Sequence, residues 1–389
     1  MLTALHTVNS LHPDTGGPAR SVTNLCSALN LIPGLRTRVF ANGSSLDEVY
    51  YGRLKSTDIE LTESKARGVI RQGKSFQQKM KALIVDSKPD LVHDHGLWLP
   101  SNYISSKLAG LHSIPYLVHS RGMLDPRALS YQPFKKEIAW RMYQQEILES
   151  AAVIFATSES EAQAIRSRGL QQPIALIPNG VDMPDIDIGQ LDAAQFKSKR
   201  KVLFLGRIHP IKGIMELLAA WGKLNLAGWE LLLAGPDQNN YLELVQRKIS
   251  ESPNSGSVRY IGPIEEKSKP ELFRTISLVV VPSQSENFGL VVAESLAHGV
   301  PVIASTGTPW SELIEHKCGW WVDCEPDSLA DALSEATALS DDQRRVMGLN
   351  GRAYINGFEW GEIATETAKV YHWVLDQNIE PPSSLLFYE

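Results

Sequence analysis

The sequence is poor in cysteine: Cys26, Cys318 and Cys324 are the only three in 389 residues. A sparse, odd-numbered set does not form a disulfide framework, so it predicts reduced thiols and a cytoplasmic location. No pair of histidines lies near these cysteines in the sequence, which makes a cysteine-based zinc site unfavourable.

Long apolar runs are also missing. No stretch of about 18 apolar residues occurs, so no membrane-spanning helix is predicted. The first residues, MLTALHTVNSLHPDTGG, have neither a basic start nor a long apolar core, so no signal peptide is predicted. The composition, with 43% hydrophobic and 21% charged residues, is that of a globular protein. The length predicts two domains of ordinary size, or three.

The net charge of −6 is unevenly distributed along the chain. Residues 1–180 carry 20 Lys and Arg against 15 Asp and Glu, whereas the remaining residues carry 18 against 29. The positive excess in the first half is compatible with an anionic acceptor, or with weak peripheral contact to the inner face of a membrane. It is too small for nucleic acid, and no basic stripe is interleaved with stacking aromatic residues.

Short apolar runs rich in β-branched residues alternate with helical patterns. Eleven runs are predicted as strands, at 2–8, 37–41, 89–95, 114–120, 151–157, 173–179, 200–207, 229–235, 258–262, 277–283 and 301–305. This alternation predicts an α/β fold with parallel sheets covered by helices on both faces.

The strands fall into two series, which predicts two doubly wound, Rossmann-like domains. Turn residues cluster near position 180, so the domains are expected to span 1–180 and 181–358. The helical pattern at 359–377 is expected to join the first domain, and the residues after it are predicted to form an irregular tail. Ligands of such sheets bind beyond the carboxyl ends of the strands, and two facing domains would enclose a cleft there.

Residues 285–299, SENFGLVVAESLAHG, follow one of the predicted strands. Gly289 permits a tight backbone at the start of a helix, whose N–H groups favour an anion. Glu286 precedes this helix and Glu294 lies between one and two turns into it. A carboxylate suits hydroxyl groups rather than the same phosphate, which assigns Glu294 to a ribose and Glu286 to a group beyond the phosphates. The alternative is a pair of solvated helix carboxylates.

Two cations follow the strand at 200–207. Arg207 and Lys212 lie at a strand-to-helix junction, where cations are unfavourable unless an anion binds. Together they can clamp a diphosphate, Arg207 as a fork and Lys212 as a point charge. A third element, Gly16-Gly17, follows the first strand and can bring backbone N–H groups close to a phosphate.

These elements together resemble the retaining nucleotide-sugar glycosyltransferases of family four, which have the GT-B fold. The resemblance covers nearly the whole chain and rests on TGGPARSV, PDLVHDHGLW, ATSESEAQAI, IPNGVD, LGRIHPIKG and SENFGLVVAESLAHGVPVIAS. It implies that Arg207 and Lys212 hold the donor diphosphate, Glu294 the ribose and Glu286 the sugar hydroxyls. Further donor contacts are implied for Gly16, Gly17, Asn287, Phe288, Gly289 and Leu290, and for the nucleotide base near Ile261.

One position departs from the family pattern. The histidine expected after the strand at 114–120 is replaced by Arg121, with His119 two residues earlier on the same strand face. Both are therefore candidates for contact with donor sugar or phosphate, and the alternative for His119 is a structural histidine. His93 and His95 share a strand face and could suggest a metal, but no third ligand is evident, so His95 is assigned to the acceptor.

Residues 132–145, QPFKKEIAWRMYQQ, combine cations with aromatic residues. They are compatible with an anionic membrane surface that carries a lipid-linked acceptor. The favoured interpretation is an ordinary amphipathic helix with its aromatic side chains in the core.

The resemblance implies transfer of a hexose-type sugar from a nucleoside diphosphate, with UDP favoured, to a hydroxyl of a glycan or lipid-linked glycan, as in surface polysaccharide synthesis. It implies no cofactor and no metal, with the cations and helix amides stabilising the leaving group. No carboxylate is placed as a nucleophile, which favours front-face displacement. Rival functions are a nucleotide-sugar epimerase, a disaccharide synthase or phosphorylase, and a non-catalytic sugar-nucleotide binding protein.

Overall fold

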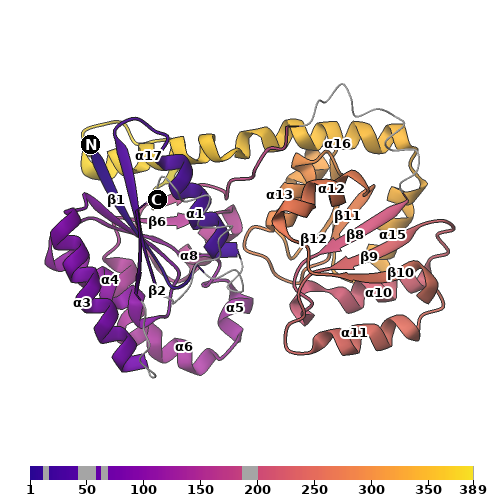
Figure 1. Ribbon diagram of the computed structural model, residues 1–389, viewed down its shortest axis with the longest axis horizontal. Helices are drawn as coiled ribbons and strands as arrows, with labels where there is room; N and C mark the ends of the chain where they lie inside the picture. The colour runs from indigo at the N-terminus through magenta and orange to yellow at the C-terminus, as the bar shows by residue number, and fades with distance from the viewer. Residues whose placement is uncertain (12–16, 43–57, 63–68, 186–199, 389) are drawn as a thin grey trace. The chain divides into compact units, whose positions relative to one another are not determined.

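The computed structural model describes residues 1–11, 17–42, 58–62, 69–185 and 200–388. The chain divides into two compact units. Unit 1 comprises residues 1–180 together with 360–389, and unit 2 comprises residues 181–359. The C-terminal helix α17 (Trp360–Leu375) therefore returns to the first unit, where it packs beside α1 (Gly17–Leu29; Figure 1).

The sheet of unit 1 has its first strand in the interior. Its order is β14 (Leu385–Leu386), β7 (Ile174–Leu176), β6 (Val153–Ala156), β5 (Tyr116–His119), β4 (Leu91–His95), β1 (Leu2–Val8), β2 (Leu35–Asn42) and β3 (Asp58–Thr62). All neighbouring pairs are parallel except β14 with β7. The chain runs outward from β1 to β3 on one side and from β4 to β7 on the other, so the topological switch point lies between β1 and β4.

Successive strand residues point to opposite faces, and each face of this sheet has its own apolar core. Leu91 packs with residues of α1 and α17, whereas its neighbour Val92 packs with residues of α3 (Val69–Ser87) and α4 (Pro100–Leu111). The remaining helices of the unit are α5 (Pro126–Ser130), α6 (Pro133–Ala139), the π-helix η2 (Trp140–Gln144), α7 (Gln145–Glu149) and α8 (Glu159–Ser167).

The sheet of unit 2 is entirely parallel. Its order is β10 (Val258–Gly262), β9 (Glu230–Ala234), β8 (Lys201–Leu205), β11 (Leu278–Val281), β12 (Val302–Ser305) and β13 (Gly319–Val322). Here the switch point lies between β8 and β11. The helical elements are η4 (Pro210–Lys212), α10 (Ile214–Lys223), α11 (Tyr241–Ser250), η5 (Ser255–Ser257), η6 (Glu266–Ser268), α12 (Lys269–Arg274), α13 (Leu290–Ala297), α14 (Glu312–Glu315), α15 (Pro326–Ala338), α16 (Asp341–Ile355) and η7 (Asn356–Phe358).

Both faces of this sheet are covered by helices. Val202 and Val280 contribute to a core that includes residues of α10 and α15, whereas Leu203 and Val279 contribute to a core that includes residues of α13. Figure 1 shows α10 and α13 on opposite sides of the strands. The two parallel-sheet units have the architecture of the GT-B fold, which confirms the predicted fold class.

The eleven predicted strands are all present, within one to three residues at their ends. Three strands were not predicted: β3, β13 and β14. All three are edge strands of their sheets, where only one neighbour selects for the apolar pattern. The prediction that the C-terminal tail is irregular throughout is wrong, because Leu385 and Leu386 pair with β7.

Ser158 caps α8 by accepting a hydrogen bond from the backbone N–H of Glu161 at 3.3 Å. The carboxylate of Glu161 itself turns toward the end of β5. None of the helices in the described ranges is both long and apolar enough to cross a membrane.

Candidate functional site

The candidate donor site lies at the switch point of unit 2. The chain continues from β8 and from β11 to helices on opposite faces of the sheet, and ligands of such sheets bind beyond the strand ends at this point. Arg207 and Lys212 come from the first segment and Glu286 from the second. The topology thus brings three of the predicted donor-binding residues to one edge of the sheet, although Glu286 is 74 residues from Lys212 in sequence.

Positive charge is concentrated after β8. Arg207 is exposed, and its Nη1 donates to Oε1 of Gln238 at 2.8 Å. Lys212 ends η4, and 15% of its side chain is exposed. Burial lowers the pKa of His209, and the charges of Arg207 and Lys212 lower it further. The imidazole of His209 is therefore close to both cations and is neutral at pH 7.

Gly213 allows this cationic segment to approach the end of β11. Its φ of 67° is left-handed, and a Cβ atom would lie 1.9 Å from the carbonyl oxygen of Pro282. The backbone N–H of Gln284 donates to the carbonyl oxygen of Ile211 at 2.8 Å across the same gap. Because the two segments are held this closely, Lys212 forms an ion pair with Glu286. Oε1 of Glu286 also accepts from Ser283 at 2.9 Å.

Helix α13 begins directly after this loop. Gly289 is its N-cap, with φ 78° and ψ 61°, so a left-handed residue turns the chain into the helix. The indole N–H of Trp310 donates to the carbonyl oxygen of Phe288, and the two rings lie 5.1 Å apart. The side chain of Phe288 is therefore part of the core, and only its backbone is available to a ligand. Asn287 precedes it and Leu290 opens the helix.

Glu294 is buried and paired, not solvated. Only 4% of the residue is exposed, and its two oxygens lie 3.0 and 3.1 Å from Nζ of Lys269. Lys269 also lies 2.7 Å from a carboxylate oxygen of Glu266. Sequence reasoning missed Lys269 because nothing in its local pattern links it to Glu294. Ile261 lies on β10, the edge strand of the same sheet, and is partly exposed.

A second group of polar residues lies at the switch point of unit 1. His93 and His95 on β4 are joined by His6 on β1, and all three are buried. Their ligand nitrogens lie within 4.8 Å of one another. No third partner for the histidine pair is evident from the sequence, and in the structure His6 is that partner. The parallel pairing of β1 with β4 places His6 directly opposite His93.

Arg121 lies just after β5 in a left-handed conformation, with φ 55°. Its guanidinium donates to Ser21 at 2.8 Å, to Asn179 at 3.1 Å and to Nδ1 of His95 at 2.9 Å. Burial lowers the pKa of Arg121 to about 10, and the negative charge of Glu161 opposes this shift, so the side chain remains a cation at neutral pH. Of the described residues, no acid lies within ion-pair distance of it.

Glu161 holds the backbone on both sides of Arg121. Its Oε1 accepts from the hydroxyl of Ser120 at 2.6 Å and from the N–H of Gly122 at 2.5 Å. Its other oxygen accepts from the N–H and the hydroxyl of Thr157, at 2.7 and 2.8 Å. The carboxylate therefore stabilises the turn that places Arg121.

His119 ends β5 opposite His95 and is 5% exposed. Within the described parts of the chain, neither of its ring nitrogens has a hydrogen-bond partner. Burial lowers its pKa well below 6.5, so the ring is neutral. Gly17 opens α1 and is exposed, whereas Gly16 lies outside the described residues.

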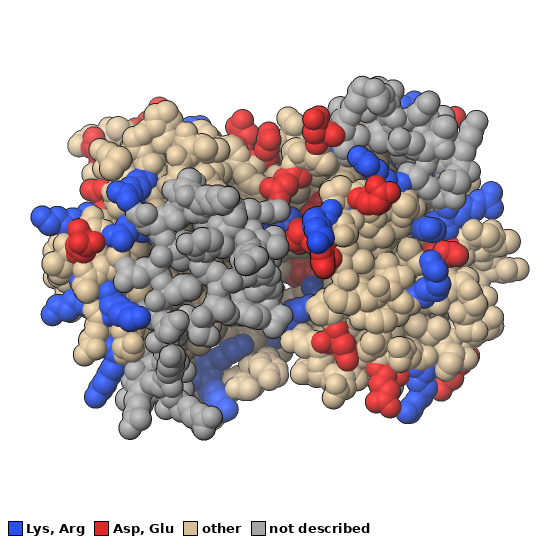
Figure 2. Space-filling model, in the orientation of Figure 1, with Lys and Arg blue, Asp and Glu red and all other residues tan. Residues whose placement is uncertain are grey.

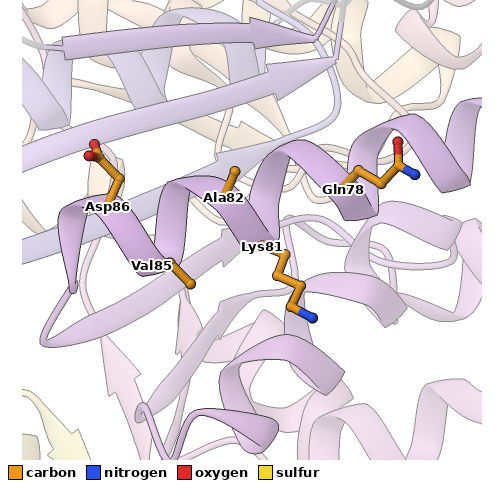
Figure 3. A pocket seen from close by; sticks show the side chains of 5 residues that line it. All are labelled: Gln78, Lys81, Ala82, Val85 and Asp86. Carbon is orange, nitrogen blue, oxygen red and sulfur yellow. The ribbon is translucent and has the colours of Figure 1, made fainter.

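A surface hollow on α3 does not have the properties of a functional site. It has a volume of about 720 Å³ and is lined by Gln78, Lys81, Ala82, Val85 and Asp86 (Figure 3). All five come from one helix, and Asp86 contacts Arg38 at 3.4 Å. The labelled side chains spread along the helix, with no group of polar atoms converging on one point.

Two family models match the chain, one in each half. The Glycosyl transferase 4-like domain matches residues 16–180, and Glycosyl transferases group 1 matches residues 191–354. HepE from Anabaena, solved in complex with UDP and glucose, superposes with a TM-score of 0.75 at 18% identity, over 95% of this chain and 98% of that chain. The fold is that of the GT-B glycosyltransferases.

The chain belongs to the group 1 glycosyltransferases, of the family-four type. It is 29% identical over 318 residues to the D-inositol 3-phosphate glycosyltransferase of Corynebacterium glutamicum, which covers 75% of this chain and 74% of that protein. It is 27% identical over 335 residues to the phosphatidyl-myo-inositol mannosyltransferase of Mycolicibacterium smegmatis, covering 84% and 81%.

Proposed function

We propose that this glycosyltransferase takes a hexose-type sugar from a nucleoside diphosphate bound to unit 2, with UDP as the favoured nucleotide. The observation that carries the proposal is the cluster of Arg207, Lys212 and Glu286 at the switch point between β8 and β11, beside the start of α13. Two cations and a helix N-terminus match the charge of a diphosphate. The UDP complex of HepE, a protein of the same fold, supports the choice of nucleotide.

The neighbouring acids suit the sugars on either side of the diphosphate. Glu286 accepts hydrogen bonds from hexose hydroxyls while it orients Lys212. Glu294 accepts from the ribose diol, and Lys269 pairs with this buried carboxylate at 3.0 and 3.1 Å. Ile261 on the edge strand lies on the side assigned to the base. Backbone N–H groups of residues 287–290 complete the phosphate contacts.

The acceptor is a hydroxyl compound bound by unit 1. His119 and Arg121 lie at the carboxyl end of β5, where an α/β sheet binds its ligand. Both ring nitrogens of His95 already contact Arg121 and His6, so His95 supports Arg121 rather than the acceptor. The two named relatives act on inositol compounds, which supports a polyol or lipid-linked acceptor over a polysaccharide. Gly16 and Gly17 are assigned to the donor phosphates.

The reaction proceeds with retention and without a metal. The bond from the anomeric carbon to the diphosphate oxygen breaks as the acceptor oxygen bonds to the same face, and the departing phosphate oxygen takes the acceptor proton. Lys212 and Arg207 stabilise the negative charge that develops on the diphosphate, which is the role a divalent ion has in other transferases.

Donor binding can be tested by thermal shift. At a UDP concentration of 100 times Kd, the ligand should stabilise unit 2 by about 2.7 kcal/mol. Arg207→Ala and Lys212→Ala should each abolish most of the increase in Tm. Lys223→Ala is the matched control, because Lys223 lies at the other end of α10, where it pairs with Asp327. An unchanged shift in both site variants would remove the diphosphate assignment.

Product analysis separates the rival functions. Incubation with a nucleotide sugar and a panel of hydroxyl acceptors should release UDP and form a glycoside. An isomerised nucleotide sugar without transfer would instead identify an epimerase, and dependence on free phosphate or on a sugar phosphate would identify a phosphorylase or synthase. Binding with neither transfer nor slow hydrolysis would identify a sensor.

We further propose that unit 1 contacts an anionic membrane surface through residues 131–142. The prediction that the aromatic side chains here lie in the core is wrong for Phe134, which is 77% exposed, although Trp140 is buried. Tyr131, Ile138 and Met142 are also exposed, at 71%, 43% and 74%. Lys135 and Arg141 flank them, and basic side chains predominate on unit 1 in the view of Figure 2. Apolar anchors flanked by cations fit anionic lipid.

Vesicle sedimentation tests this membrane contact. Phe134→Glu with Met142→Glu should reduce partitioning onto phosphatidylglycerol vesicles by about two orders of magnitude, since each apolar side chain contributes to burial and each new carboxylate is repelled. Leu31→Glu with Leu111→Glu is the control, because both leucines are equally exposed elsewhere on unit 1, at 81% and 77%. Equal partitioning of the two double variants would refute the assignment.

A further inference from the structure

A chain of hydrogen bonds runs through the buried histidines of unit 1 and ends at Arg121. Nη2 of Arg121 lies 2.9 Å from Nδ1 of His95, whose Nε2 lies 3.0 Å from Nδ1 of His6. Nε2 of His6 lies 3.2 Å from the hydroxyl of Tyr371, which lies 2.7 Å from Nδ1 of His93. Tyr371 comes from α17, so the chain joins the C-terminal helix to the strand ends.

Arg121 fixes the direction of the bonds that run from His95 through His6 to Tyr371, and the hydroxyl of Tyr371 completes the chain at His93. A guanidinium can only donate, so Nδ1 of His95 must be bare. Burial lowers the pKa of His6 to about 3 and those of His93 and His95 well below 6.5, so each ring carries one proton. His95 therefore donates through Nε2 to His6, and His6 donates through Nε2 to the hydroxyl of Tyr371. That hydroxyl donates to Nδ1 of His93.

The same direction argues against a metal ion between the three imidazoles. Ligation through Nε2 of His95 would leave a proton on Nδ1, and this N–H would face the N–H of Arg121 at 2.9 Å. The rings of His93 and His95 are also stacked, with centroids 4.4 Å apart and planes within 27°, whereas ligands of one ion must aim their in-plane lone pairs at a common point. The cluster is better explained by hydrogen bonding.

Unpartnered polar groups remain at the end of β5. Among the described residues, Nε of Arg121 has no hydrogen-bond partner and is buried, and so are both ring nitrogens of His119. Arg121 as a residue is partly exposed, which gives this end of the strand access to solvent. A buried donor without a partner is costly, and a cation without an ion-pair partner more so. An anionic oxygen would supply both the missing hydrogen-bond acceptor and the missing negative charge.

We propose that Arg121 and His119 bind an anionic group, such as a phosphate, and that His6 and Tyr371 are positioning residues that hold Arg121 for this contact. The assignment rests on the proposed function, in which the anion belongs to a substrate of the transfer. Tyr371 acts at a distance: its hydroxyl fixes His6, His6 fixes the tautomer of His95, and His95 then offers one acceptor to the guanidinium. Glu161 fixes the backbone of the same residue.

The experiment uses the full chain labelled with ¹⁵N at arginine and histidine. In the unliganded protein, the ring-nitrogen spectrum should show Nδ1 of His95 bare and Nε2 protonated. Titration with inorganic phosphate should then shift the Nε–H resonance of Arg121, assigned by its loss in Arg121→Lys. Tyr371→Phe should weaken this response by about tenfold, because the acceptor of the guanidinium is no longer fixed.

Thr367→Val is the matched control. Thr367 is buried in the same helix, and among the described residues its hydroxyl bonds only to the carbonyl oxygen of Ile363 at 2.8 Å, so its loss should leave the phosphate response unchanged. If the Nε–H resonance of Arg121 does not shift with phosphate, the anion site is overturned. An equal response in Tyr371→Phe would overturn the positioning role, and a protonated Nδ1 of His95, or stoichiometric Zn²⁺ bound by the purified protein, would overturn the chain. None of these readouts requires sugar transfer, so they stand apart from failure of the proposed function.

Discussion

Lys212→Ala is expected to lower kcat for sugar transfer by a factor of about 10² to 10³, the cost of removing one fixed charge from a developing oxyanion. Lys212 has little exposed surface and is held against the loop after β11 by Gly213 and by the backbone bond between Gln284 and Ile211. Its position is therefore set before the substrate binds. The variant also leaves Glu286 without its cation, and that carboxylate then opposes the leaving diphosphate.

Steady-state kinetics at saturating donor measures the effect, with slow donor hydrolysis as the readout until an acceptor is identified. Lys212→Arg retains the charge and should lose less activity than Lys212→Ala. Lys223→Ala removes an exposed lysine from the same region of the chain and should stay within about twofold of the wild type, as expected for an exposed ion pair. If Lys212→Ala keeps its kcat within about threefold, the diphosphate is stabilised elsewhere.

Acidification from pH 6.5 to 5 is expected to destabilise unit 1 steeply. His6, His93, His95 and His119 have folded-state pKa values below 6.5, because burial disfavours their charged forms. The unfolded chain binds these protons near pH 6.5 and the folded protein does not. Stability is therefore fully present above pH 6.5 and is lost as the pH falls below it.

The slope can reach about 1.4 kcal/mol per pH unit for each histidine, and roughly 5 kcal/mol per pH unit for the four together. Asp94 acts in the opposite direction, because burial raises its pKa and the folded state then binds more protons than the unfolded state above pH 3.8. Its contribution can offset one histidine at most.

Chemical denaturation at a series of pH values measures this slope. His93→Asn should lower the slope by about 1.4 kcal/mol per pH unit, which corresponds to one proton. His112→Asn alters an exposed histidine of the same unit and should leave the slope unchanged. Stability that stays level between pH 7 and 5.5 would contradict burial of the neutral imidazoles.

Most of the fold could be predicted from the sequence because each strand or helix has a pattern that is recognisable within its own segment. Interior strands such as β6 (VIFA) and β11 (LVVV) are continuous apolar runs, buried on both faces, and these are recognisable without their neighbours. β3, with the sequence DIELT, and β14, with only two residues, are edge strands and lack that signal. Arg207, Lys212 and Glu286 were predicted as donor contacts for a related reason, since each lies in the segment that follows a strand.

The sequence by itself determined the two parallel sheets, their helices and the segments that carry charge at the strand ends. Only the tertiary structure decided which side chains meet: Lys269 with Glu294, His6 with His95 across 89 residues, and Tyr371 with His93 across 278. The physical reason is that periodicity records how one segment faces the core, whereas these contacts depend on strand order and register. A shift of one residue in the pairing of β1 with β4 would turn His6 to the opposite face of the sheet.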